Sequence, residues 1–314
     1  MNPPNGRQPE IPVVLFAYAR PHTLARTLAC LRADKVPRII AFSDGPRRAE
    51  DAPAVGEVRG MLRTVDWCEL ELHERNENLG LGRSILTGVK EALDRHQAVI
   101  VFEDDLICVP GTYHYLAAAL ARYRDDSRVM SVTGWTHPRV TPGDVGEGPY
   151  FDGRAECWVW GTWARGWRGM DRPAAELVRT CCDRGIDPGR YGHDLLEMAG
   201  VELERNIWAV RFLYAHIAEG GLCFRPPRSL VEHIGWGADA TNASLESGWG
   251  NPPLRPCPPI PEVWPEPIEH PLCGQIWRAA CPEPKAASSG LRRRWSNRLR
   301  RIVPSHLLQR FIRR

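Results

Sequence analysis

The sequence lacks the hydrophobic segments of a membrane-spanning or secreted chain. No apolar run approaches the length of about 20 residues that a helix needs to cross a bilayer. The first ten residues are polar, and the apolar stretch after them is short, which is not the pattern of a secretory signal. These absences predict a cytoplasmic protein.

Cysteine pairs with zinc-site spacing are also missing. The ten cysteines include no Cys-x-x-Cys pair, the spacing found in many zinc sites. Cys181 and Cys182 are adjacent, which suits a shared zinc ion poorly. A chain of 314 residues does not need a disulfide framework, so we expect reduced thiols.

Positive charge is concentrated at the end of the chain. Residues 291–314 hold nine arginines and no acidic residue, whereas the net charge of the whole chain is only +3. Four apolar residues of this tail recur at helical spacing: Leu291, Trp295, Leu299 and Ile302. A basic amphipathic helix binds in the headgroup plane of an anionic membrane, so we expect peripheral attachment to the inner face of the cell membrane. We expect no nucleic-acid partner, because the apolar face favours lipid; a disordered basic end is the alternative.

Strand and helix patterns alternate from residue 11 to residue 133. Short apolar runs predict strands, and apolar residues spaced three and four apart predict the helices between them. The expected strands are 11–17, 38–42, 67–73, 98–102 and 128–133. This alternation predicts an α/β fold with a mainly parallel sheet and crossover helices.

The later part of the chain changes in composition. We expect one domain over residues 1–250, with halves at about 11–134 and 135–250. Residues 252–284 contain eleven prolines, which predicts an extended, poorly packed arm over 251–290, followed by the tail over 291–314.

Three carboxylates follow the apolar run of residues 98–102. Glu103, Asp104 and Asp105 must leave the sheet there, because unpaired carboxylates are costly to bury. Oxygen ligands on a short segment suit a hard divalent cation, Mg²⁺ or Mn²⁺, that also holds phosphates. The alternative is a solvated acidic turn.

Polar residues also follow the other predicted strands. Arg20 comes after the first strand and Asp44 after the second, and the ends of parallel strands meet at one edge where ligands bind. Arg20 could hold a phosphate and Asp44 a base or ribose; a surface salt bridge and a turn cap are the alternatives. In the loop 75–83, Gly80 and Gly82 allow close approach of a ligand before a helix that suits anions. No Gly-Lys-Ser/Thr follows, which excludes a P-loop.

The order of these motifs resembles a nucleotide-sugar glycosyltransferase with the GT-A fold. It is similar to the family 2 bacterial sugar transferases and to the Golgi enzyme N-acetylglucosaminyltransferase I, which also has a Glu-Asp-Asp-Leu sequence. The resemblance covers about residues 11–245. The segments that carry it are Ala17-Tyr-Ala-Arg-Pro21, Ser43-Asp-Gly-Pro46, Arg75-x-x-Asn78-Leu-Gly80, Glu103-Asp-Asp-Leu106, the tryptophan-rich stretch 158–167, 206–211 and 227–235.

The resemblance implies a role for each matching residue. Asp105 would bind the metal, and His233 is a further metal contact, with a strand histidine satisfied by a neighbour as its alternative. The implied substrate-binding residues are Arg20 and Asp44 for the nucleotide, Asp104 for the ribose, Glu103 for the donor sugar, and Arg75, Asn78, Gly80 and Arg211.

Trp158 and Trp160 are expected to form an acceptor platform, because sugars stack on aromatic rings; core packing is the alternative and is preferred for two of the four tryptophans in 158–167.

The catalytic base departs from the family pattern. In the Golgi relative an acidic pair precedes a tryptophan, whereas Asn206 and Ile207 precede Trp208 here. Glu204 and Asp194 are the acids we expect to act as base, with Glu204 preferred because it is nearer to Trp208.

The sequence therefore predicts a metal-dependent transferase that moves a sugar from a nucleotide sugar, by resemblance a UDP-sugar, to a glycan or lipid-linked hydroxyl. By resemblance the reaction is inverting, and residues 135–250 form the acceptor half. One alternative is a nucleotidyltransferase, although residues 18–21 lack the glycine-rich basic loop that it would need. The other is an inactive sugar-nucleotide-binding protein, which the missing acid before Trp208 favours.

Overall fold

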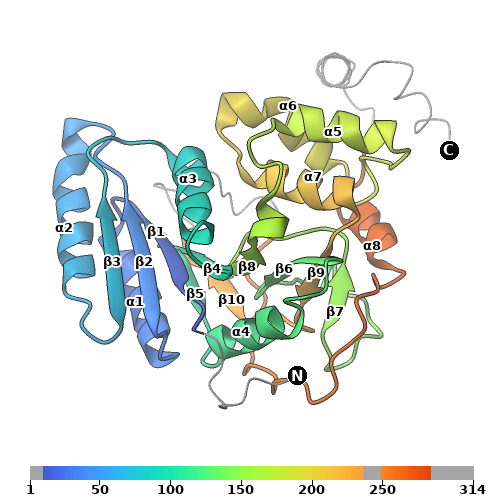
Figure 1. The fold of residues 1–314 in the computed structure, drawn as a ribbon, viewed down its shortest axis with the longest axis horizontal. Helices are drawn as coiled ribbons and strands as arrows, with labels where there is room; N and C mark the ends of the chain where they lie inside the picture. Colours follow the sequence, from blue (N-terminus) through green and yellow to red (C-terminus); the bar gives the residue numbers. More distant parts are fainter. Residues whose placement is uncertain (1–9, 236–248, 284–314) are drawn as a thin grey trace.

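The apolar runs of the sequence form the strands of one eight-stranded sheet (Figure 1). A computed structural model describes residues 10–235 and 249–283 of the chain. The strand order is β3-β2-β1-β4-β8-β6-β9-β7. The strands are β1 (Val13–Ala17), β2 (Arg38–Ser43), β3 (Glu69–Glu74), β4 (Ala98–Glu103), β6 (Val129–Thr133), β7 (Tyr150–Asp152), β8 (Trp160–Trp163) and β9 (Leu222–Arg225).

The sheet is parallel at one end and mixed at the other. Strands β3, β2, β1 and β4 are all parallel, and β6 is parallel to β9. Strand β8 runs antiparallel to β4 and β6, and β7 runs antiparallel to β9. A two-stranded ribbon pairs β5 (Leu106–Cys108) with β10 (Val231–His233). The predicted fold class, a mixed and mainly parallel sheet flanked by helices, is confirmed.

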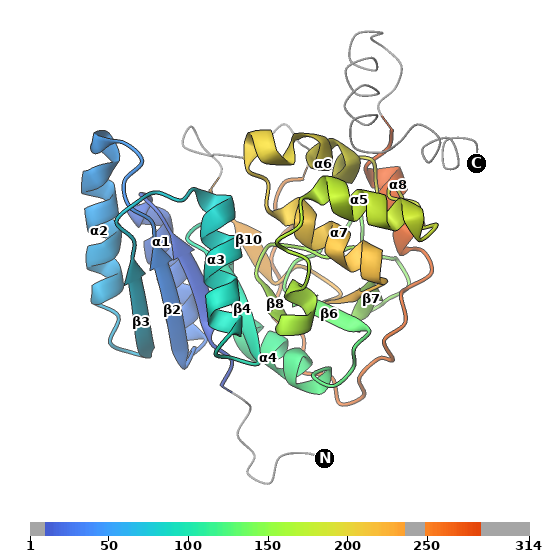
Figure 2. The same cartoon turned by 45° about the horizontal axis from the view of Figure 1, so that its top comes forward.

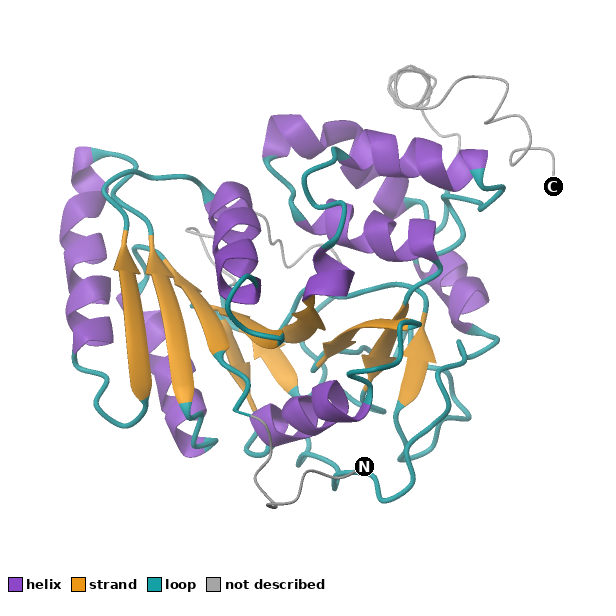
Figure 3. Ribbon diagram, in the orientation of Figure 1, coloured by secondary structure: helices purple, strands orange, loops and turns teal. Residues whose placement is uncertain are grey.

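Helices flank the sheet throughout (Figure 3). They are α1 (Pro21–Ala33), α2 (Ala52–Arg63), α3 (Leu81–Leu93), α4 (Thr112–Arg122), α5 (Ala174–Asp183), α6 (Asp194–Arg205), α7 (Ala209–Glu219) and α8 (Cys273–Ala280). Figure 2 shows α5, α6 and α7 packed together over the half of the sheet that contains β8 and β6. Within the described ranges, every helix is too short or too polar to span a bilayer.

The parallel end of the sheet is tightly packed against α3. Strands β1 and β4 are fully or nearly fully buried, as their continuous apolar runs predict. A Cβ atom added to Gly88 of α3 would lie 2.8 Å from the ring of Phe16 and 3.0 Å from that of Phe42. A residue without a side chain therefore lets α3 approach the sheet closely, and α3 in turn fixes the loop before it.

The segment predicted to be a poorly packed arm is in fact anchored to the second half of the sheet. The Tyr123 hydroxyl donates to the Pro265 carbonyl over 2.8 Å, and Trp277 Nε1 donates to Asp152 Oδ2 over 2.8 Å. Trp277 is only 1% exposed. The many prolines remove backbone donors and keep residues 250–267 out of helices and strands, but side chains supply the contacts that the backbone cannot.

Candidate active site

The ends of β1 and β4 bring Arg20 onto the acidic triplet. Arg20 Nη2 lies 2.6 Å from Asp104 Oδ1, and Nη1 lies 2.7 Å from Asp105 Oδ2. The backbone N–H of Tyr18 donates to Asp104 Oδ2 over 2.7 Å. Both aspartates are almost completely buried, so the triplet is not a solvated acidic turn. An internal cation and a backbone donor therefore provide part of the compensation that buried carboxylates need.

Arg20 alone does not offset the charge of the triplet. Burial, and then the charges of Asp105 and Asp104, raise the pKa of Glu103 to about 8. Burial also raises the pKa of Asp104 to about 7, although Arg20 acts in the opposite direction. Both pKa values are therefore raised mainly by burial and further by the neighbouring carboxylates, a setting in which a bound cation would favour the ionised forms.

Asp105 is the carboxylate best placed to bind that cation. Burial alone would raise the pKa of Asp105, but the hydrogen bond with His233 and the charge of Arg20 outweigh it and lower the pKa. His233 Nε2 lies 3.2 Å from Asp105 Oδ2, because β10 and β5 pair with His233 opposite Leu106. Asp105 Oδ1 is buried and has no hydrogen-bond partner within the described part of the chain.

The two predicted metal ligands are therefore adjacent. A buried, unbonded carboxylate oxygen beside an imidazole nitrogen fits a divalent cation such as Mn²⁺, which accepts both oxygen and nitrogen ligands. Two protein ligands leave coordination positions for phosphate oxygens and water, which is how such ions are commonly held with nucleotides.

Gly235 lies directly over the Arg20–Asp105 ion pair. A Cβ atom at this position would clash with Asp105 Oδ2 and would lie 2.9 Å from Arg20 Nη1. The backbone N–H of Ile234 also donates to the Asp105 carbonyl over 2.8 Å. Residues 234 and 235 therefore hold the backbone and side chain of Asp105 in one position.

Replacing Gly235 with alanine is expected to displace Asp105 from Arg20. The added methyl group forces these side chains to move, and overpacking of this kind typically costs about 1–3 kcal/mol. We expect a lower midpoint of thermal unfolding and weaker Mn²⁺ binding in a calorimetric titration. Gly56→Ala on α2 is the matched control, because nothing lies within 4 Å of a Cβ there. Unchanged Mn²⁺ affinity in the Gly235 variant would contradict this prediction.

Asp44, at the end of β2, organises the loop that follows β3. Arg75 Nη1 donates to Asp44 Oδ1 over 2.9 Å, and the backbone N–H of Leu79 donates to Oδ2 over 3.0 Å. Asn78 Nδ2 donates to the carbonyl of Gly45 over 2.9 Å. Asp44 is therefore neither a simple turn cap nor an isolated surface group. Its first role is to fix the loop of residues 75–80, and three of the predicted substrate-binding residues lie within this one network.

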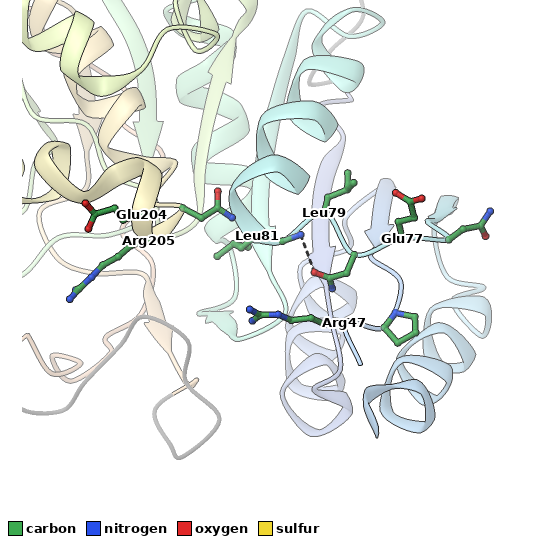
Figure 4. A pocket seen from close by; sticks show the side chains of 11 residues that line it. Arg47, Glu77, Leu79, Leu81, Glu204 and Arg205 are labelled. Carbon is green, nitrogen blue, oxygen red and sulfur yellow. Dashed lines mark hydrogen bonds between the residues drawn. The ribbon is translucent and has the colours of Figure 1, made fainter. Parts of the chain in front are cut away.

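A pocket of about 710 Å³ lies beside this loop (Figure 4). It opens between the turn after β2, the loop before α3 and the C-terminal end of α6. Its lining residues are Pro46, Arg47, Asn76, Glu77, Asn78, Leu79, Gly80, Leu81, Glu204, Arg205 and Asn206. Two arginines, several amides and glycine backbone give it the polar character that a ribose or phosphate group requires.

The two candidate bases lie in different surroundings. Glu204 lines the pocket from the end of α6 (Figure 4). Both carboxylate oxygens of Asp194 instead bind Arg154, at 3.0 and 2.8 Å, and Arg154 lies over the ring of Trp277 at 3.9 Å. The expectation for Asp194 is therefore corrected, because its carboxylate is the counter-ion of a buried arginine and does not line this pocket.

Asn206 occupies the place of the missing acid and has a structural contact there. Its backbone is left-handed, with φ of 54°, as it ends α6. Its side-chain amide lies against Gly82, where any Cβ atom would clash with it. The amide thus joins α6 to the start of α3, and this leaves Glu204 as the acid of this segment that lines the pocket.

Two further substrate-binding expectations need correction. Trp160 is 1% exposed and packs against Trp167 and Phe212, so its ring cannot stack on a sugar. Arg211 pairs with the buried Glu202 and donates to the Met170 carbonyl over 3.2 Å. Trp160 is therefore part of the hydrophobic core, and the Arg211 guanidinium is the ion-pair partner of Glu202 on α6.

Trp158, by contrast, lies close to the candidate metal site. It is half-buried, and its ring stacks on His233 at a centroid distance of 5.0 Å and an interplanar angle of 17°. Tyr18, Gly235 and Asn251 were not identified from the sequence. Tyr18 contributes a backbone N–H and Gly235 the absence of a side chain, so their segments were recognised by resemblance but their roles were not. Asn251 lies beyond the family-like region.

One other group of side chains has the spacing of a metal site. Within the described ranges, Glu71, His73 and Glu91 each offer a potential ligand atom, and these atoms lie within 4.8 Å of one another. Arg95 donates to both oxygens of Glu71, over 2.9 and 2.8 Å, and lowers the pKa of Glu71 to about 2. This arrangement is an ion-pair cluster on β3 and α3.

Comparisons with known proteins give distant likenesses to solved structures, among them the following two. No family model and no curated protein matches the sequence. The mannosyltransferase PcManGT from Pyrobaculum calidifontis, in complex with GDP-Man and Mn²⁺, is 15% identical with a TM-score of 0.44; the match covers 78% of this chain and 60% of that one. S. aureus TarS 1–349 is 9% identical with a TM-score of 0.42, covering 72% and 60%. The chain thus spans 60% of each matched structure, and likeness at this level assigns no activity.

Proposed function

We propose that the protein is a divalent-cation-dependent glycosyltransferase that moves a sugar from a nucleotide sugar, a UDP-sugar by resemblance, to a hydroxyl of a glycan or lipid-linked acceptor. One observation carries the proposal: a single edge of a mainly parallel sheet gathers Arg20, the acidic triplet and His233. A nucleoside diphosphate gains negative charge as it leaves, and a cation held by carboxylates would stabilise that charge. The motif resemblance supports the same class.

The residues of the donor side have separable roles in this proposal. Asp105 and His233 would hold Mn²⁺ or Mg²⁺, which supplies positive charge to the departing diphosphate. Asp104, oriented by Arg20 and by the N–H of Tyr18, would approach the ribose. The Glu103 carboxylate lies beside those of Asp104 and Asp105 and would bind hydroxyls of the donor sugar.

The acceptor side requires a proton acceptor. In an inverting displacement the acceptor oxygen attacks the anomeric carbon from the face opposite the diphosphate, the bond to the diphosphate oxygen breaks, and the hydroxyl proton goes to a base. Glu204, in the wall of the pocket, would take that proton. Trp158, stacked on His233, would contact the acceptor sugar.

Incubation of the purified full chain with Mn²⁺ and a panel of nucleotide sugars tests the proposal. Release of the nucleoside diphosphate from one of them, with or without added acceptor, is the expected result. Formation of a nucleotide sugar and pyrophosphate from a nucleoside triphosphate and a sugar phosphate would instead favour a nucleotidyltransferase. Binding without turnover would favour an inactive sugar-nucleotide-binding protein, the alternative that Asn206 supports.

A membrane surface is the second partner that we propose, from the sequence of residues 291–314, which lie outside the described ranges. Each of the nine arginines contributes about 1 kcal/mol of binding free energy near an anionic surface, before screening by salt. We therefore expect the full chain to sediment with anionic liposomes and a chain ending at Gly290 to remain in solution. Neutral liposomes are the control. Equal sedimentation of both chains with anionic vesicles would exclude the tail as the anchor.

A further inference from the structure

One edge of β10 is paired by a side chain in place of a strand. Strand β10 pairs with β5, and at His233 its peptide groups point away from β5. There the N–H of His233 donates to Asn251 Oδ1 over 3.1 Å, and Asn251 Nδ2 donates to the His233 carbonyl over 2.7 Å. A primary amide carries one acceptor and a donor group side by side, so Asn251 makes both bonds that a neighbouring strand residue would make.

His233 is thereby held at three places by three different segments. Asn251 binds its backbone, Trp158 stacks on one face of its ring, and Asp105 lies 3.2 Å from its Nε2. Because β10 is only three residues long, few other bonds oppose a shift of its backbone. A small displacement of that backbone would move the imidazole away from Asp105.

We propose that Asn251 is a positioning residue that holds His233 in register with Asp105, so that both can bind one divalent cation. This inference rests on the metal site of the proposed function. Residues that orient a metal ligand typically contribute about 10- to 100-fold to metal affinity when they are removed. Asn251 lies outside the region that resembles the glycosyltransferases, and its two bonds to His233 are both to the main chain.

Titration of the full-length protein with Mn²⁺ alone, followed by calorimetry, tests this inference. Asn251→Leu roughly keeps the size of the side chain but removes the two hydrogen bonds to the His233 backbone. Asn251→Ala serves as a second variant if leucine does not fit. We expect about 10- to 100-fold weaker Mn²⁺ binding in either variant. The unfolding midpoint measured without metal should change little, because the bonds removed lie at the rim of the sheet.

A double-mutant cycle separates positioning from a general structural effect. If Asn251 acts through His233, the double variant Asn251→Leu with His233→Ala binds Mn²⁺ no more weakly than His233→Ala alone. Glu232→Gln is the matched control. Asn251 Nδ2 also donates to Glu232 Oε1, over 3.2 Å, and the glutamine leaves the bonds to His233 intact, so its Mn²⁺ affinity should be unchanged.

The outcomes distinguish this inference from the proposed function. Wild-type Mn²⁺ affinity in Asn251→Leu, together with weak binding in His233→Ala, would overturn the role of Asn251 alone. Fully additive losses in the double variant would overturn it as well. Equal Mn²⁺ binding by the wild type and by Asp105→Ala would overturn the metal site and this inference together.

Discussion

Replacing Asp105 with alanine is expected to lower turnover at least about 100-fold. Loss of a residue that only orients a metal ligand already lowers metal affinity or activity about 10- to 100-fold. Asp105 contacts Arg20 and His233 through one oxygen, and its buried second oxygen is free for a cation within the described part of the chain. The fold should persist, since Asp105 lies at the rim of the sheet and Arg20 keeps its bond to Asp104.

Two measurements check this expectation. Initial rates of nucleoside diphosphate release give the turnover, and a thermal unfolding curve shows whether the variant is folded. Asp94→Ala is the matched control, because Asp94 forms an exposed pair with Lys90 before the start of β4, whereas the triplet lies at the end of that strand. Normal turnover in Asp105→Ala would end the metal-site interpretation, and equal loss in Asp94→Ala would show a nonspecific effect.

Replacing Glu204 with glutamine is expected to lower acceptor-dependent turnover by about 100- to 10,000-fold, the usual contribution of a general base. Glutamine keeps the size of the side chain but cannot take the proton of the acceptor hydroxyl. Binding of the nucleotide sugar and of Mn²⁺ should remain, because neither contact involves Glu204 in the proposed mechanism. A fall in kcat with little change in KM for the donor is therefore the expected kinetic signature.

Two further variants make the test of Glu204 specific. Glu57→Gln, at an exposed position on α2, should retain full turnover. Asp194→Asn should lower the unfolding midpoint, because Arg154 is buried and loses its ionised partner, while the folded enzyme keeps its kcat. If Glu204→Gln keeps full acceptor-dependent turnover and Asp194→Asn loses it, the roles assigned to these two acids are reversed.

The sequence by itself determined the fold of residues 11–134. Continuous apolar runs such as residues 98–102 are typical of strands buried on both faces, and helix patterns between such runs favour parallel crossovers. Carboxylates directly after such a run mark the end of the strand, and the triplet does lie at the end of β4, although Glu103 is still paired within the strand and Asp104 and Asp105 are buried. These inferences hold because burial and periodicity are properties of short segments, and a strand keeps its pattern whatever its neighbours are.

Only the tertiary structure decided which polar side chains are paired. Arg20 binds Asp104, which lies 84 positions away in the sequence, whereas Asp194 binds Arg154. Asp104 therefore belongs to the candidate site, and Asp194 neutralises a buried arginine. Trp158 and Trp160 belong to the same tryptophan-rich stretch, yet Trp160 is buried within β8, whereas Trp158 lies before that strand and stacks on His233. Asn251 completes the edge of β10 from a proline-rich segment. The partners of a polar or aromatic side chain depend on segments that folding brings together, and local sequence carries no information about them.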